Sequence, residues 1–332
     1  MIIVDPSSKY KKRGTMKKFF GLFLVLLISL ISFTSCKGIE KTNIVSTCFA
    51  GYDFASHVAG DKKSASMLLA PGQELHDYSP SPSDIERIIS SEVFIYIGGE
   101  SDAEWVEKQI LPELNKDKTL VLSLMDIVKT KGNTYDEENP ESAQEEKEEE
   151  EAELDEHVWN SISNAIIIVE AISNAISKID DTNSEYYSKN AESYISSLVS
   201  LDKEIKSIVE NKKNDLLIFA DRFPLLYFVK EYNLKYDAAY KGCATVKQEN
   251  TIVTERLIKK VIDNHIKVVF QIELSESNIA ASIQNECKKR GQEVLVRTFY
   301  TMHNVSKEDY QNKVSYVDFM KKNIESLKIA LS

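Results

Sequence analysis

Histidine is rare in this chain, and its positions limit the chemistry that the sequence can support. Five histidines occur among 332 residues. Three of them, His76, His157 and His303, stand in loops or at the ends of expected elements. Neutral imidazoles that converge from different parts of a fold suit Zn²⁺ or a similar borderline divalent ion. His57 and His265 instead stand inside an expected helix and just before an expected strand, where packing or surface roles are the simpler interpretation.

The loop around His76 is stiffened by proline. The stretch "PGQELHDYSPSPSD" contains Pro71, Pro80 and Pro82, and proline fixes the backbone φ angle. The loop follows an expected strand, and ligands of parallel α/β folds bind beyond the carboxyl ends of strands. A histidine held in place in this way can bind a metal without a large ordering cost. Position alone does not define a metal site, however, because each of the three histidines also fits an ordinary packing role.

Short apolar runs alternate with helical segments in both halves of the chain. The expected strands are 43–48, 66–70, 93–98, 120–124, 216–220, 232–240, 267–273 and 293–300. Helices are expected between them, one of them beginning at Ser81 as N-cap with Pro82 at its first position. A last helix is expected at 306–331. Strands separated by helices indicate βαβ units, so we expect an α/β protein with two parallel-sheet lobes.

A long helix is expected to join the two lobes. Residues 182–213 contain neither Gly nor Pro, and their apolar positions fall at helical spacing. Another helix is expected before it, at 158–179. A rigid helix of this length would fix the separation of the lobes and limit hinge motion, with a metal cleft between the lobes. The expected domains are a signal peptide and lipobox (1–36), a first lobe (37–181), the linking helix (182–213) and a second lobe (214–332).

Residues 136–156 form a strongly acidic segment. They hold thirteen acidic residues against one lysine, a net −12 in 21 positions. Self-repulsion at this density predicts a disordered surface loop, which either collects divalent ions or serves as a solvated spacer. The whole chain has a net charge of −11. We therefore expect no nucleic-acid partner, since phosphate binding needs a basic face.

The N-terminus indicates export and anchoring. Lys17 and Lys18 precede the apolar run 19–33, which leads into "TSC" ending at Cys36. This is the pattern of a secretory signal, and the run is short for a membrane span of roughly 20 residues. A cysteine at this point resembles a bacterial lipobox, so we expect lipidation of Cys36 and an extracytoplasmic, membrane-anchored protein. An uncleaved signal anchor is the alternative, and Met16 is a second candidate start.

The remaining cysteines do not predict a thiolate site. Cys48, Cys243 and Cys287 are an odd number at wide spacing, which is no disulfide framework. The sequence leaves open one bridge between Cys243 and Cys287.

Four segments resemble the metal-binding lipoproteins of bacterial zinc and manganese ABC importers. "PGQELHDYSPSPSDI" looks like that family's first-ligand loop, and "DEHVWNSISNA" looks like its second, where Asp-Pro-His-Val-Trp is usual. "FADRFPLLYFVKEYNL" is similar to the third-ligand region, and "QIELSESNIAASIQNE" to a later strand and helix. The resemblance covers nearly all of residues 42–331. It implies two α/β lobes joined by a long helix, with His76 and His157 as ligands.

The chain departs from this family at the other two ligand positions. Members have His or Glu within the stretch that here reads Ala220, Asp221, Arg222. Asp221 could serve as a ligand or could pair with Arg222. The fourth family ligand is often Asp in the loop after the last strand, near which this chain has His303. The expected ligands are His76, His157 and His303, with Asp221 or water completing the shell.

The resemblance implies a receptor that captures Zn²⁺ and delivers it to the permease of an ABC importer, without a chemical reaction. Mn²⁺ is the second choice, because it prefers more oxygen ligands than a three-histidine site supplies. A secreted zinc hydrolase is the rival, since three histidines with an open fourth position also describe catalytic zinc. It would need a general base near the bound water, for which Asp221 is a candidate and Glu74 is better read as a loop or outer group. An adhesin with an incidental metal site is a third possibility.

Overall fold

The protein is described from a computed structural model that covers residues 42–76, 78–136, 154–242 and 251–332. The signal segment, Cys36, most of the acidic segment and Cys243 lie outside the described residues. Cys48 and Cys287 are buried free thiols, and burial raises the pKa of the Cys48 thiol to about 12. Cys48 is therefore protonated at neutral pH and unsuited to binding a metal.

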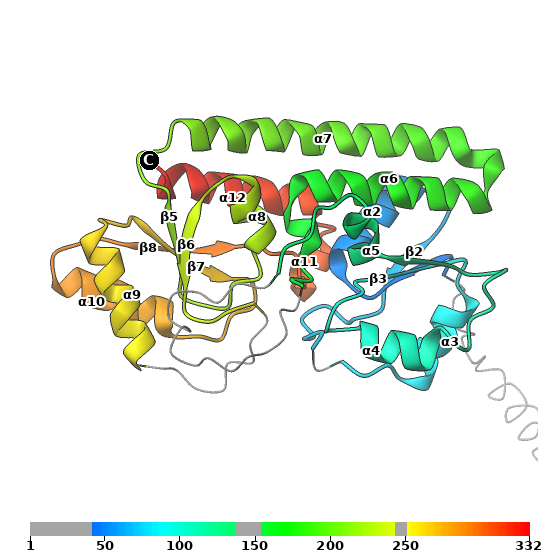
Figure 1. Ribbon diagram of the computed structural model, residues 1–332, viewed down its shortest axis with the longest axis horizontal. Coiled ribbons are helices and arrows are strands. Elements are labelled where there is room, and N and C mark those ends of the chain that lie inside the picture. The colour runs from blue at the N-terminus through cyan, green and yellow to red at the C-terminus, as the bar shows by residue number, and fades with distance from the viewer. Residues whose placement is uncertain (1–41, 77, 137–153, 243–250) are drawn as a thin grey trace, which may run out of the picture. The chain divides into compact units, whose positions relative to one another are not determined.

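Two four-stranded parallel sheets form the framework, which confirms the expected fold class (Figure 1). The first has the order β2-β1-β3-β4, with bounds β1 (Ile44–Ser46), β2 (Ala65–Met67), β3 (Val93–Tyr96) and β4 (Leu120–Ser123). The second has the order β6-β5-β7-β8, with bounds β5 (Leu216–Phe219), β6 (Lys235–Ala238), β7 (Val268–Ile272) and β8 (Leu295–Phe299). Strands β1 and β3 are buried throughout, as expected of parallel sheets covered on both faces. The two lobes share one strand order although their sequences show no repeat.

Helices follow the strands in each half of the chain. Those of the first half are α2 (Phe49–Ala59), α3 (Pro82–Ser90), α4 (Ala103–Trp105), the π-helical η1 (Val106–Ile110) and α5 (Leu124–Lys129). Those of the second half are α8 (Leu226–Glu231), α9 (Thr251–Asp263), α10 (Ile279–Lys289), α11 (Lys307–Gln311) and α12 (Tyr316–Ala330). As expected, Ser81 caps α3, in a capping box with Asp84 and with Pro82 at the first turn.

The expected linking helix is present as α7 (Ser184–Glu210), 27 residues long. Its buried side chains follow the predicted apolar spacing and include Tyr187, Tyr194, Leu198 and Ile205. The helix packs against α2 of the first lobe and α12 of the second, and it runs along both lobes in Figure 1. One apolar stripe on α7 therefore contacts both lobes.

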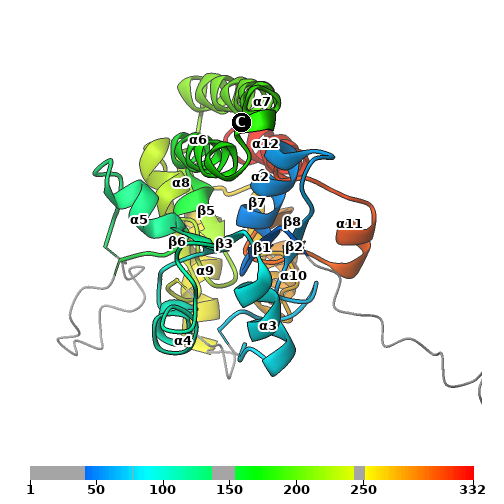
Figure 2. The same ribbon diagram turned by 90° about the vertical axis from the view of Figure 1, so that its right-hand side faces the viewer.

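The helix expected at 158–179 is divided. A 3-10 turn, η3 (Val158–Asn160), precedes α6 (Ile162–Ile179), because Ser161 takes an extended conformation and caps α6 by accepting from the Asn164 N–H. A second short turn, η4 (Asp181–Asn183), leads from α6 into α7. By length and composition α6 could cross a membrane, but half of it is buried within the fold. It packs against α2 and α7 (Figure 2), so we assign it to the core.

The prediction of a single last helix at 306–331 is wrong. Lys313 has a φ of +54°, a left-handed conformation that an α-helix cannot contain. The chain therefore forms α11, a turn, and then α12. Ser315 is the N-cap of α12 and forms a capping box with Asp318.

Ser315→Ala should destabilise the fold by about 1 kcal/mol, because alanine removes the acceptor for the Asp318 N–H. The free energy of unfolding in urea measures the change. Ser200→Ala on the exposed face of α7 is the matched control and should have little effect, since alanine favours a helix interior. Equal losses in the two variants would contradict a specific capping role.

Candidate metal centre

The three histidines singled out by their loop positions meet in space. His76 follows β2, His157 stands at the N-cap of η3, and His303 follows β8. The ring centroid of His303 lies 5.3 Å from that of His76 and 5.3 Å from that of His157. Donors from both sheets therefore gather around His303, as the sequence predicts.

The ring nitrogens at this site are placed to receive a ligand. Nε2 of His76 and Nε2 of His303 are buried and have no hydrogen-bond partner among the described residues. Leaving such an atom unsatisfied costs about 1–3 kcal/mol. Nδ1 of His157 lies 3.2 Å from an Asp155 carboxylate oxygen, an arrangement that orients a metal-binding imidazole through its other nitrogen. These features fit a metal ion better than a packing role.

The possible ligands form two overlapping clusters. One contains Glu74, His76 and His303; the other contains Glu156, His157 and His303. Within each cluster the ligand atoms lie within 4.8 Å of one another. Donors bound to one tetrahedral zinc at 2.0–2.1 Å stand roughly 3.4 Å apart. A small inward movement of side chains would therefore suffice, and His303 belongs to both sets.

Each of the two carboxylates has its own anchor. Glu74 accepts a hydrogen bond from the Arg222 guanidinium at 3.1 Å, and its other oxygen lies 3.7 Å from His303 Nδ1. Glu156 accepts from the backbone N–H of Ser101 at 3.0 Å and from the Ser101 hydroxyl. Sequence reasoning gave Glu74 only an outer role and did not nominate Glu156. The sequence did offer one indication of Glu156: it directly precedes His157, at a position where the resembling family usually has proline.

Glu156 also corrects the extent of the acidic loop. The expected disordered segment ran through residue 156, but Asp155 and Glu156 are ordered and only 2% and 4% exposed. Tyr227 donates to the Asp155 carbonyl at 2.8 Å. Tertiary contacts therefore offset the charge repulsion at this end of the segment.

Asp221 is buried close to the end of β5 but belongs to neither cluster of described residues. One carboxylate oxygen accepts from the backbone N–H of Arg222 at 2.8 Å, and the other has no hydrogen-bond partner in the part of the chain that is described. The Arg222 guanidinium binds Glu74 instead of the Asp221 carboxylate. A ligand role for Asp221 stays a prediction.

The loop that carries His303 is fixed from two directions. The half-buried Glu273 carboxylate accepts from the N–H and the hydroxyl of Thr301 at 2.8 and 2.7 Å. The indole N–H of Trp159 donates to the Thr301 carbonyl at 2.9 Å. Met302 then takes a φ of +55°, which turns the chain into His303. The His303 position therefore depends on contacts with both β7 and η3.

The loops of His76 and His303 also contact each other. The Gly72 N–H donates to the side-chain oxygen of Asn304 at 3.4 Å, and the Asn304 amide donates to the Gln73 carbonyl. The two ligand loops are thereby held together across the lobes.

His303 is neutral under ordinary conditions. Burial is the main cause that holds its pKa well below the usual range, and the nearby His157, His76 and Arg222 act in the same direction. A metal binds the neutral imidazole. The site therefore keeps this lone pair available.

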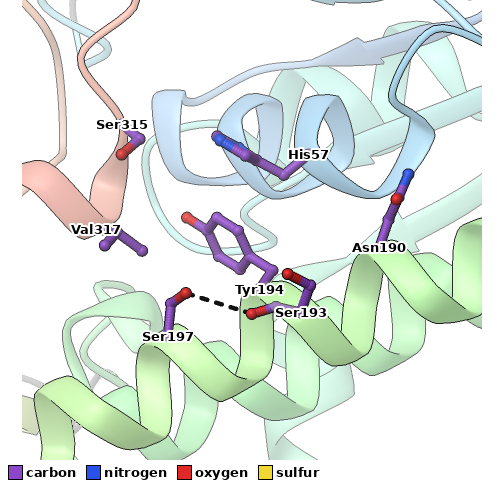
Figure 3. A pocket seen from close by; sticks show the side chains of 7 residues that line it. All are labelled: His57, Asn190, Ser193, Tyr194, Ser197, Ser315 and Val317. Carbon is purple, nitrogen blue, oxygen red and sulfur yellow. Dashed lines mark hydrogen bonds between the residues drawn. The ribbon is translucent and has the colours of Figure 1, made fainter.

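His57 and His265 lie outside both clusters, and both are exposed. His57 of α2 faces Tyr194 of α7 beside a pocket that Ser315 also lines (Figure 3). Burial opposes its protonation, but the hydrogen bond and negative charge of Asp53 outweigh burial and raise the pKa of His57. His265 has a φ of +51° in the turn before β7. Both positions agree with the packing or surface roles expected from the sequence.

The raised pKa of His57 predicts a pH-dependent stability. Protonated His57 stabilises the folded chain. This stabilisation is fully present below the pKa of about 6.5 that histidine has in the unfolded chain, and it is lost as pH rises through the higher pKa in the folded chain. His57→Gln should therefore reduce the fall in unfolding free energy between about pH 6 and pH 8. Urea denaturation at both pH values measures it. His265→Asn should retain the wild-type difference, and an unchanged difference in His57→Gln would contradict the assignment.

Comparisons with known proteins show what this chain is similar to. The family model described as zinc-uptake complex component A, periplasmic, matches residues 44–330. The chain is 29% identical over 325 residues to the high-affinity zinc uptake system protein ZnuA of Bacillus subtilis, covering 95% of this chain and 98% of that protein. It is 28% identical to the zinc-binding lipoprotein AdcA of Streptococcus pneumoniae, covering 87% of this chain but only 55% of that longer protein. The Zn(II)-bound ZnuA-like domain of AdcA superposes with a TM-score of 0.68 at 26% identity, covering 88% of this chain and 99% of the domain.

Proposed function

Because the chain belongs to the ZnuA family of periplasmic zinc-uptake components, we propose that it captures Zn²⁺ outside the cytoplasm and delivers it to the permease of an ABC importer. His76, His157 and His303 hold the ion, and an oxygen donor completes the shell, for which Asp221 is the sequence-based candidate. Zinc is the cargo, so the chain's residues bind and release it and carry out no reaction. Mn²⁺ is the alternative cargo within the same family.

One observation carries this proposal. Imidazoles from three separate segments converge, and two of them bury an Nε2 atom that no described protein group satisfies. Such an arrangement is costly for a packing cluster and suited to a borderline divalent ion. The neutral state of His303 supports it further, because no proton has to be displaced from that ring.

The chain's organisation fits this role. We propose that lipidation of Cys36 anchors the mature protein, that residues 37–181 and 214–332 act as the two lobes, and that α7 keeps their relative motion small. With α7 packed on both lobes, metal release would use small movements of the ligand loops.

Equilibrium competition on the full chain in detergent tests the function. We expect one equivalent of zinc, retained in the presence of excess manganese. Retention of manganese against zinc would identify the alternative receptor of the same family, and tight binding of neither ion would exclude the receptor. Turnover of ester or peptide substrates by the zinc-loaded chain would favour the secreted hydrolase instead.

A further inference from the structure

Glu156 is a buried carboxylate directed at the histidine cluster. One of its carboxylate oxygens lies within 4.8 Å of a ring nitrogen of His157 and of a ring nitrogen of His303. Its Oε1 atom is 3.8 Å from Nε2 of His76, the nitrogen without a hydrogen-bond partner among the described residues. That separation exceeds a hydrogen bond and approaches the roughly 3.4 Å between two donors on one tetrahedral zinc. Glu156 is therefore near all three predicted histidine ligands.

The surroundings of Glu156 hold it in this position. Ser101 donates its backbone N–H to Oε2 and its hydroxyl to Oε1. Gly99 leaves the necessary room, because a Cβ atom there would come within 2.4 Å of both Cβ and Oε2 of Glu156. A donor group that is already ordered binds a metal at lower cost.

The carboxylates of Glu74 and Asp221 are less suited to be the oxygen ligand. Glu74 is bound to the Arg222 guanidinium, and its side chain is 36% exposed. Asp221 is buried but lies in neither cluster of described residues. Glu156 is thus the buried carboxylate that shares a cluster with two histidines and approaches the third.

We propose that Glu156 supplies the oxygen ligand of the metal, with Ser101 as its positioning residue and Gly99 as the residue that makes room for it. The proposal rests on the receptor function above and replaces Asp221 as the candidate that completes the shell. A carboxylate at this point also offsets one of the two positive charges of the ion in a buried site.

Glu156→Gln is the direct test, because it removes the charge and preserves the shape. Zinc affinity by chelator competition should fall at least about 100-fold, since loss of an outer-shell partner alone costs about 10- to 100-fold. The visible spectrum of the Co²⁺-loaded chain should change with the altered ligand field. Asp221→Asn should lose much less affinity than Glu156→Gln, because Asp221 lies in neither cluster of described residues. The isosteric control Glu185→Gln, at the exposed start of α7, should keep the wild-type affinity.

Ser101→Ala extends the test to a variant that keeps every proposed ligand. It should weaken zinc binding about tenfold, with no additional loss when combined with Glu156→Gln. Wild-type affinity and an unchanged Co²⁺ spectrum in Glu156→Gln would overturn the proposal, as would a large loss confined to Asp221→Asn. Failure of the wild-type chain to bind zinc would instead overturn the receptor function and this proposal with it.

Discussion

Replacing His303 with alanine is expected to lower zinc affinity by at least about 100-fold. His303 belongs to both clusters of possible ligands, so its loss removes a donor from either arrangement. The apo chain should stay folded, because the substitution also removes a buried nitrogen that no described protein group satisfies. Chelator competition measures the affinity, and circular dichroism measures the fold.

His265→Asn is the matched control for this variant. It removes an exposed histidine that lies in neither cluster, and asparagine tolerates the left-handed backbone at that position. Its zinc affinity should equal that of the wild type. Unchanged zinc binding in His303→Ala would move the third donor to Asp221 or elsewhere.

Trp159→Phe is expected to lower the free energy of unfolding by about 1–3 kcal/mol and to weaken zinc binding. Trp159 is fully buried, and its indole N–H donates to the Thr301 carbonyl in the loop before His303. Phenylalanine retains most of the apolar contact but leaves that carbonyl without its partner. In the wild-type chain the Trp159 ring also lies parallel to the His303 ring, with the ring centroids 6.3 Å apart. Urea denaturation and zinc competition on one preparation measure both effects.

Trp105→Phe provides the comparison for Trp159→Phe. Its indole nitrogen is buried without a hydrogen-bond partner among the described residues, so phenylalanine removes no hydrogen bond there. We expect a smaller loss of stability and wild-type zinc affinity. Equal losses from the two tryptophan variants would show that the Trp159–Thr301 hydrogen bond contributes little.

Much of the fold could be predicted because local patterns determine it. The eight apolar runs correspond to the eight strands, and the serine–proline start of α3 and the apolar spacing of α7 are confirmed. The break between α11 and α12 was missed because it depends on the left-handed backbone of Lys313. A lysine in the sequence does not indicate such a conformation, whereas a glycine would. The split at Ser161 was missed because a capping serine resembles any polar residue on a helix.

The candidate site could be predicted only in part, for a physical reason. Loop histidines after strands can be found from the sequence, because the ends of parallel strands are places where ligands bind. The role of a carboxylate depends on its tertiary neighbours, which the sequence does not display. Glu156 ends a run of acidic residues that reads as solvated, yet Ser101 and Gly99, more than fifty positions earlier in the chain, give it a buried place.

Anomalous scattering at the zinc edge from crystals of the zinc-loaded chain tests the central claim most directly. We expect one strong peak between the lobes, with nitrogen atoms of His76, His157 and His303 at about 2.0–2.1 Å. A peak bound by other residues, or none near these three rings, would contradict the account.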